Sequence, residues 1–141
     1  MLEGPHRYLR AYLAGVAFPT AFLVVILSVF AVLASTGRVS WPTAALLIFP
    51  MAVVPNLWGL WNVAYVALSK RRAADIGLFG ALLPSVIAPL GYLTAKALGH
   101  PLPYGWETLT AAFALAVLVY YLVWKHVVRY LNESLELEMT P

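Results

Sequence analysis

The sequence predicts an all-α integral membrane protein, a bundle of four transmembrane helices that run up-down-up-down with both termini in the cytoplasm. Three observations predict it. The chain of 141 residues is 62% hydrophobic and only 11% charged, and a soluble domain needs far more charge to cover its surface. Its mean hydropathy is +0.83. Four apolar runs of about 20 or more residues are each long enough to cross about 30 Å of hydrocarbon.

We expect one transmembrane domain over residues 1–141. The expected spans cover about 11–35, 41–69, 76–98 and 106–124, followed by a helical cytoplasmic tail over 125–138. The first apolar run is too long for the core of a signal peptide, so it reads as an uncleaved signal-anchor.

The ends of the first two spans carry recognisable signals. Gly37 is placed to stop the first helix, and Pro19 should bend that helix and free the carbonyl of Gly15. The second span should begin at 40–42, where a serine, an interfacial tryptophan and a proline follow one another.

The later boundaries are marked as well. Asp75 is well placed to cap the third span, and the proline-rich stretch 99–105 cannot continue a helix. Beyond the fourth span, Lys125, Arg129 and Glu133 follow at i, i+4 spacing, which favours a helical extension into water. We expect the acidic end of this tail to fray.

The basic residues predict the orientation. Seven of the nine Lys and Arg residues lie at the N-terminus, in the 70–72 loop and after the fourth span, whereas Arg38 and Lys96 lie on the opposite side. The positive-inside rule therefore puts both termini in the cytoplasm. The membrane we expect is the cytoplasmic membrane of a bacterium. Topology also explains the basic pI better than nucleic-acid binding does, so we expect no nucleic acid partner.

Two pairs of prolines point to a site in the middle of the membrane. Pro50 and Pro55 recur as Pro84 and Pro89, the same five-residue step in two successive spans. Each proline leaves a carbonyl four residues earlier without its donor, and these carbonyls belong to Leu46, Met51, Gly80 and Ser85. Paired, proline-interrupted helices are a sequence pointer to a midplane binding site. The ordinary alternative is that prolines only kink membrane helices for packing.

Polar and aromatic residues of the second span add to this hypothesis. Asn56 lies on a face of small residues, where an amide either bonds across a helix interface or lines a polar cavity. Asn62 shares a nearly opposite face with three aromatic residues, Trp58, Trp61 and Tyr65. That stripe is either an interfacial aromatic belt or a platform for a lipid tail or a quinone-like ring.

The third span carries a stripe of small residues that permits a neighbouring helix to approach closely. Its members are Gly77, Gly80, Pro84, Ala88, Gly91 and Ala95. We interpret it as a packing face, either within the four helices or across a homodimer. At the outer ends of the third and fourth spans, Lys96 and Glu107 are expected to form a surface ion pair.

Several classes of function find no residues to support them. The chain has no cysteine, and His6, His100 and His126 have no metal-ligand spacing, so no metal or other cofactor is expected. No acidic residue lies within the predicted hydrocarbon core, and no catalytic motif appears. We therefore expect no enzyme activity.

Two hypotheses for function stay open. The first is a module that binds or transports a lipid-like or weakly polar small molecule between the second and third spans, either as a single chain or as a homodimer. The second is a non-catalytic accessory or assembly subunit of a larger membrane complex. Membrane lipids are partners in both. The candidate ligand-binding residues are Pro50, Pro55, Asn56, Trp58, Trp61, Asn62, Tyr65, Pro84, Ser85 and Pro89.

Overall fold

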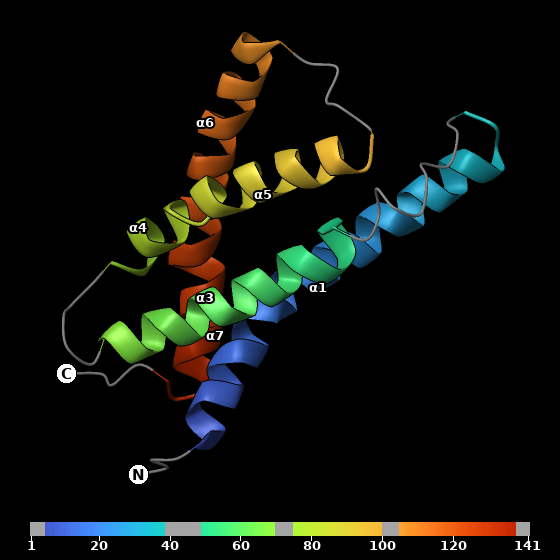
Figure 1. The fold of residues 1–141 in the computed structure, drawn as a ribbon. Helices are drawn as coiled ribbons and strands as arrows, with labels where there is room; N and C mark the ends of the chain where they lie inside the picture. Colours follow the sequence, from blue (N-terminus) through green and yellow to red (C-terminus); the bar gives the residue numbers. More distant parts are fainter. Residues whose placement is uncertain (1–4, 39–48, 70–74, 100–104, 138–141) are drawn as a thin grey trace.

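The computed structural model describes residues 5–38, 49–69, 75–99 and 105–137, and this part of the chain is helical throughout apart from short turns (Figure 1). The first helix is α1 (Pro5–Ser35). A π-helical turn, η1 (Phe49–Val53), leads into α3 (Val54–Ser69). The third span is divided into α4 (Ile76–Ala81) and α5 (Pro84–Ala97). The last comprises α6 (Trp106–Val123), the π-helical η2 (Trp124–Val128) and α7 (Arg129–Ser134).

Four helical segments of the described chain are long and apolar enough to cross a membrane: His6–Ser35, Phe49–Ser69, Ile76–Ala97 and Trp106–Ser134. They match the four predicted spans. The first helix begins earlier than expected, at Pro5 rather than near residue 11. The predicted start of the second span at 40–42 and the basic loop 70–72 lie outside the described residues.

Two predicted helix ends are confirmed. Gly37 has a φ of 72°, the left-handed conformation that glycine adopts without steric cost. The N–H of Gly37 donates to the carbonyl of Ala34 at 3.0 Å, and the N–H of Arg38 donates to the carbonyl of Leu33 at 3.0 Å. These two bonds end α1 in a Schellman motif. At the start of α4, the Asp75 carboxylate accepts a hydrogen bond of 2.9 Å from the N–H of Leu78.

The C-terminal tail differs from the prediction. The ion pair between Arg129 and Glu133 is present at 2.8 Å, but the helix ends at Ser134 rather than continuing to 138. Glu136 takes a φ of 54°, and the N–H of Leu137 then donates to the carbonyl of Asn132 at 2.9 Å. This turn folds the chain back as far as Leu137, and residues 138–141, where fraying was also expected, lie outside the described residues.

The turn docks the tail against the first helix. Leu137 is only 2% exposed. Its carbonyl accepts a hydrogen bond of 2.9 Å from Nη2 of Arg7, near the start of α1. The two ends of the described chain therefore lie side by side.

The buried core is gathered at the end of the molecule where these two segments meet. Its members come from the N-terminal half of α1, from α3, from α4 and the turn after it, from η2, and from the turn after α7: Ala11, Ala14, Trp58, Tyr65, Val66, Ile76, Leu83, Trp124, Val128 and Leu137. No residue of α6 is buried within the described structure. In Figure 1 the second half of α1 and the first half of α6 extend away from this core in different directions.

The extended parts expose apolar side chains, as surfaces in contact with lipid do. On α1, for example, Phe22, Val25 and Val32 are 54%, 60% and 63% exposed. Such a surface is unusual on a soluble monomer. It fits the membrane-spanning length of the helices.

Glycines set the closest helix crossings. A Cβ on Gly15 would lie 2.6 Å from the carbonyl oxygen of Trp58, and one on Gly59 would lie 2.6 Å from the Tyr12 ring. These two glycines let α1 and α3 approach backbone to backbone.

Two glycines of the predicted small-residue stripe have a similar role inside the chain. Trp124 packs directly over Gly80, and a Cβ on Gly77 would lie 2.8 Å from the Tyr121 ring. This part of the stripe is therefore a packing face between α4 and the last span.

Candidate ligand-binding cavity

A cavity of about 940 Å³ lies between α5 and α6. The α5 wall includes Pro84, Ser85, Ala88, Pro89 and Tyr92. The α6 wall includes Trp106, Leu109, Ala112, Phe113, Ala116 and Tyr120, and Phe49 and Pro50 of η1 close one side. In Figure 1 the first part of α5 crosses α6 and the two helices then diverge, and the cavity lies between them.

The break in the third span creates this divergence. Leu82 and Leu83 lie in a turn between α4 and α5, and Pro84 occupies the first turn of α5, where its missing N–H costs nothing. The sequence predicted that Pro84 would leave the Gly80 carbonyl without a donor. This prediction is wrong, because the N–H of Leu83 donates to it at 3.0 Å.

The break is tied to α3 through a neighbouring carbonyl. Nε1 of Trp61 donates a hydrogen bond of 2.9 Å to the carbonyl oxygen of Phe79, just before the break. The ring of Trp61 also packs on that of Phe79, with centroids 5.1 Å apart. Trp61 therefore holds the end of α4 rather than lining the cavity.

The cavity is mostly apolar, with a few hydroxyl groups. Thr94 and Thr110 donate back to the carbonyls of their own helices, to Leu90 and Trp106, each at 2.8 Å. The Tyr120 hydroxyl accepts a hydrogen bond of 3.2 Å from Nε1 of Trp58. Ser85 adds an exposed hydroxyl to the wall. A large apolar pocket with a few polar groups is the usual form of a small-molecule site.

The aromatic stripe of the second span packs inside the protein. Trp58 is 3% exposed and Tyr65 is 6% exposed. The Trp58 ring lies 5.8, 4.8 and 5.5 Å from the rings of Phe18, Tyr120 and Trp124. Trp58 thus backs the wall to which Tyr120 contributes, without reaching the cavity itself.

Asn62 takes part in a fully buried amide pair. Its Nδ2 donates to Oδ1 of Asn132 at 2.8 Å, and Nδ2 of Asn132 donates to Oδ1 of Asn62 at 3.0 Å. Nδ2 of Asn62 also donates to the carbonyl of Ala11 at 2.8 Å. Both asparagine side chains are 0% exposed. The pair ties α1, α3 and α7 together, and the sequence analysis did not single out Asn132.

Asn56 lies on the exposed side of α3 and contacts α1. Its Oδ1 accepts a hydrogen bond from the Tyr12 hydroxyl, and its Nδ2 donates to the carbonyl of Ala52 at 2.5 Å. Of the two predicted roles of Asn56, the hydrogen bond across a helix interface is the one that agrees with this arrangement.

Four of the ten candidate residues line the cavity: Pro50, Pro84, Ser85 and Pro89. The other six lie elsewhere in the protein: Pro55, Asn56, Trp58, Trp61, Asn62 and Tyr65. We expected the space between the second and third spans, whereas the cavity lies between the third and fourth. The residues of α6 were missed, although Ala112 and Ala116, one helical turn apart, follow the spacing of a face that leaves room for a neighbour.

The end of α5 and the start of α6 also depart from the prediction. Lys96 and Glu107 do not form the expected ion pair, and the ion pair found in the described part of the chain joins Arg129 and Glu133. Among the residues that the structure describes, no three His, Cys, Asp or Glu side chains gather in a way that could hold a metal ion.

The four membrane-length helices define the class, a multi-pass helical membrane protein. Comparison of the chain with family models, with curated proteins and with solved structures gives no match.

Proposed function

We propose that this multi-pass membrane protein binds or transports a lipid-like or weakly polar small molecule in the cavity between α5 and α6. The observation that carries the proposal is the cavity itself, about 940 Å³ and lined mainly by apolar and aromatic side chains. This size is near the top of the range of about 300–1,000 Å³ for ligand sites.

The position of the cavity supports the same class of ligand. It lies between the third and fourth helical segments of membrane-spanning length, and its apolar wall suits a ligand drawn from the hydrocarbon. The few hydroxyls suit a molecule with one weakly polar group, because both threonines of the lining, Thr94 and Thr110, already donate to their own helix.

We place the four spans up-down-up-down with both termini in the cytoplasm. The hydrogen bond from Arg7 to the Leu137 carbonyl supports this, since it holds the start and the end of the described chain on the same side. The excess of Lys and Arg near both ends and in the 70–72 loop favours the cytoplasm for that side.

The alternative, an accessory subunit of a larger complex, drew on the small-residue stripe of the third span. Tyr121 and Trp124 of the same chain pack against two of its glycines, Gly77 and Gly80. Pro84, Ala88, Gly91 and Ala95 border the cavity. Gly77 and Gly80 are therefore not available to a partner subunit, and the rest of the stripe faces the cavity, which favours the ligand-binding proposal.

Filling the cavity tests the proposal. Ala112 lines the cavity and is exposed, so Ala112→Phe would place a ring in the space that the ligand needs. Ala111, the preceding residue, is also exposed but does not line the cavity, so Ala111→Phe is a matched control. Both changes should alter stability by only about 0.5 kcal/mol, as surface substitutions do.

Native mass spectrometry of the protein in mild detergent measures the retained ligand. We expect the wild type and Ala111→Phe to retain a lipid or small molecule, and Ala112→Phe to lose it. Equal retention by the two variants would show that the cavity is not the site. A wild-type chain that carries no ligand, or one that is extracted together with a larger foreign subunit, would favour the accessory role.

A further inference from the structure

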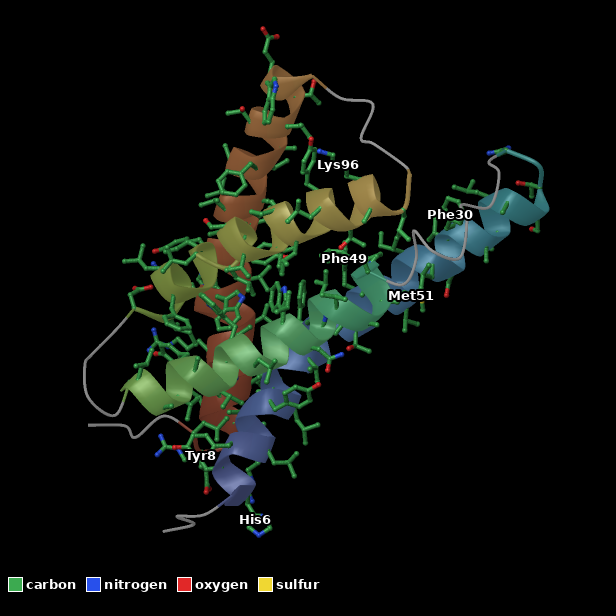
Figure 2. The ribbon with its side chains drawn as sticks, in the orientation of Figure 1. His6, Tyr8, Phe30, Phe49, Met51 and Lys96 are labelled. Atoms are coloured by element: carbon green, nitrogen blue, oxygen red, sulfur yellow. The ribbon has the colours of Figure 1, made fainter. Side chains whose placement is uncertain are left out.

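Lys96 lies beside the cavity, between Tyr92 and Leu98, which both line it, although Lys96 itself is not part of the lining. It belongs to the last turn of α5 and is exposed. Ser85, Pro89 and Tyr92 line the cavity, and Lys96 continues their spacing of four, three and four residues along one side of α5. In Figure 2 the Lys96 side chain leaves α5 on the side of the opening toward α6.

The ammonium group has no carboxylate partner in the described part of the chain. Glu107, the acidic residue at the start of α6, does not pair with it, and the ion pair of the described structure is at Arg129 and Glu133. Leu98, two residues beyond Lys96, again lines the cavity. An unpaired cation therefore stands at the edge of a large apolar space.

Aromatic residues at the same end mark the level of a lipid headgroup. Trp106, the first residue of α6, lines the cavity while 79% of its surface is exposed, and Tyr92 of α5 is 42% exposed. Amphipathic rings of this kind favour the membrane–water interface. Lys96 and these two rings belong to the last two turns of α5 and the first turn of α6, and the rest of the wall is mainly apolar with a few hydroxyl groups.

We infer that the cavity holds an anionic membrane phospholipid, with its acyl chains between α5 and α6 and its phosphate beside Lys96. This inference rests on the proposed function and names its ligand. Charge complementarity selects an anionic head, and the apolar wall accepts the chains. A phospholipid is the amphiphile that surrounds an intramembrane opening, which favours it over a free fatty acid.

A lysine in the last turn of a helix also has an ordinary role, since it interacts favourably with the helix dipole and extends toward water. That role predicts no choice between lipid headgroups. Headgroup preference is therefore the property that separates the two.

The experiment adds equal amounts of phosphatidylglycerol and phosphatidylcholine, with matched acyl chains, to the delipidated full-length protein and counts the bound lipids by native mass spectrometry. We expect the wild type to retain phosphatidylglycerol about fivefold over phosphatidylcholine, the factor expected of one cation near an anionic headgroup. Lys96→Gln should bring the ratio to about one while total retention stays measurable, and Lys96→Arg should keep the preference.

Arg38→Gln is the matched control, because it removes one positive charge near the outer end of α1, away from the cavity lining. It should keep the wild-type ratio. A preference that survives in Lys96→Gln, or that Arg38→Gln reduces equally, would overturn the inference.

Two further arms separate the remaining possibilities. Stronger retention of oleate than of phosphatidylglycerol would overturn the assignment to a phospholipid. If Ala112→Phe retains both phospholipids as well as the wild type does, the proposed function itself fails. If the wild type retains both without headgroup preference and Ala112→Phe loses them, only the role of Lys96 is overturned.

Discussion

Asn62 and Asn132 exchange two amide hydrogen bonds, of 2.8 and 3.0 Å, although they lie 70 positions apart in the chain. Asn62 also bonds the backbone of α1 through the carbonyl of Ala11. Because both side chains are fully buried, removal of either one leaves the other without its partner.

We expect Asn62→Leu to lower the free energy of unfolding by about 1–3 kcal/mol, because it leaves the buried Asn132 amide without its partner and removes the bond to the Ala11 carbonyl of α1. Asn132→Leu should cost less, since Asn62 keeps its bond to Ala11. The double variant should lose less than the sum of the two. Unfolding of all four proteins in mixed micelles measures this, and strictly additive losses would contradict a coupled pair.

Gly80→Ala should destabilise the protein through crowding. Its new methyl group would meet Trp124, which is fully buried and has no room to retreat. Overpacking of this kind costs about 1–3 kcal/mol.

The control for this crowding is Gly91→Ala in the same span, where a Cβ would lie 3.3 Å from the Phe49 ring. Thermal unfolding should show a clear loss for Gly80→Ala and little change for Gly91→Ala. The same melting temperature for both variants would show that Trp124 yields easily.

Glu136→Gly should raise stability. Glu136 holds a φ of 54° at the turn after α7, a conformation that costs a residue with a side chain about 1–2 kcal/mol and glycine much less. Part of that gain is offset by the extra freedom of glycine in the unfolded chain.

Glu133→Gly is the matched control, because it places glycine inside α7 and removes the ion pair with Arg129. We expect chemical unfolding to show a gain of about 0.5–1 kcal/mol for Glu136→Gly and a loss of about 1 kcal/mol for Glu133→Gly. A loss for both would mean that the turn does not form in solution.

Asn56→Ala should leave ligand retention unchanged. Its side chain bonds Tyr12 of α1 and the carbonyl of Ala52, and it does not line the cavity. We expect a loss of about 1 kcal/mol or less in stability, the usual worth of a hydrogen bond between membrane helices. Native mass spectra matching the wild type would agree with this, and loss of the bound molecule would place Asn56 in the site.

Features set by a few neighbouring residues could be predicted from the sequence. The apolar runs gave four spans, Gly37 and Asp75 marked helix ends, and the i, i+4 spacing of Arg129 and Glu133 gave the helical extension after the fourth span. Each of these depends on local backbone geometry or on composition.

Features that depend on distant partners could not be predicted. The Asn62–Asn132 pair requires α3 and α7 to meet, and neither asparagine is distinguishable from an exposed one by its neighbours. The position of the cavity was missed because repeated prolines suggested that the second and third spans enclose it, whereas the turn before Pro84 directs α5 away from α6. The π-helical turns at 49–53 and 124–128 have no spacing that marks them in advance.

The concentration of the core at one end gives the molecule a pivot. Near Pro84, α5 is held by buried neighbours on α4 and the last span, while its 14 residues reach about 21 Å toward Gly99. A rotation of only about 10° at the pivot would swing the far end by about 4 Å at this length. The width of the cavity mouth therefore depends on the direction in which α5 leaves Pro84, and not on the glycine crossings between α1 and α3.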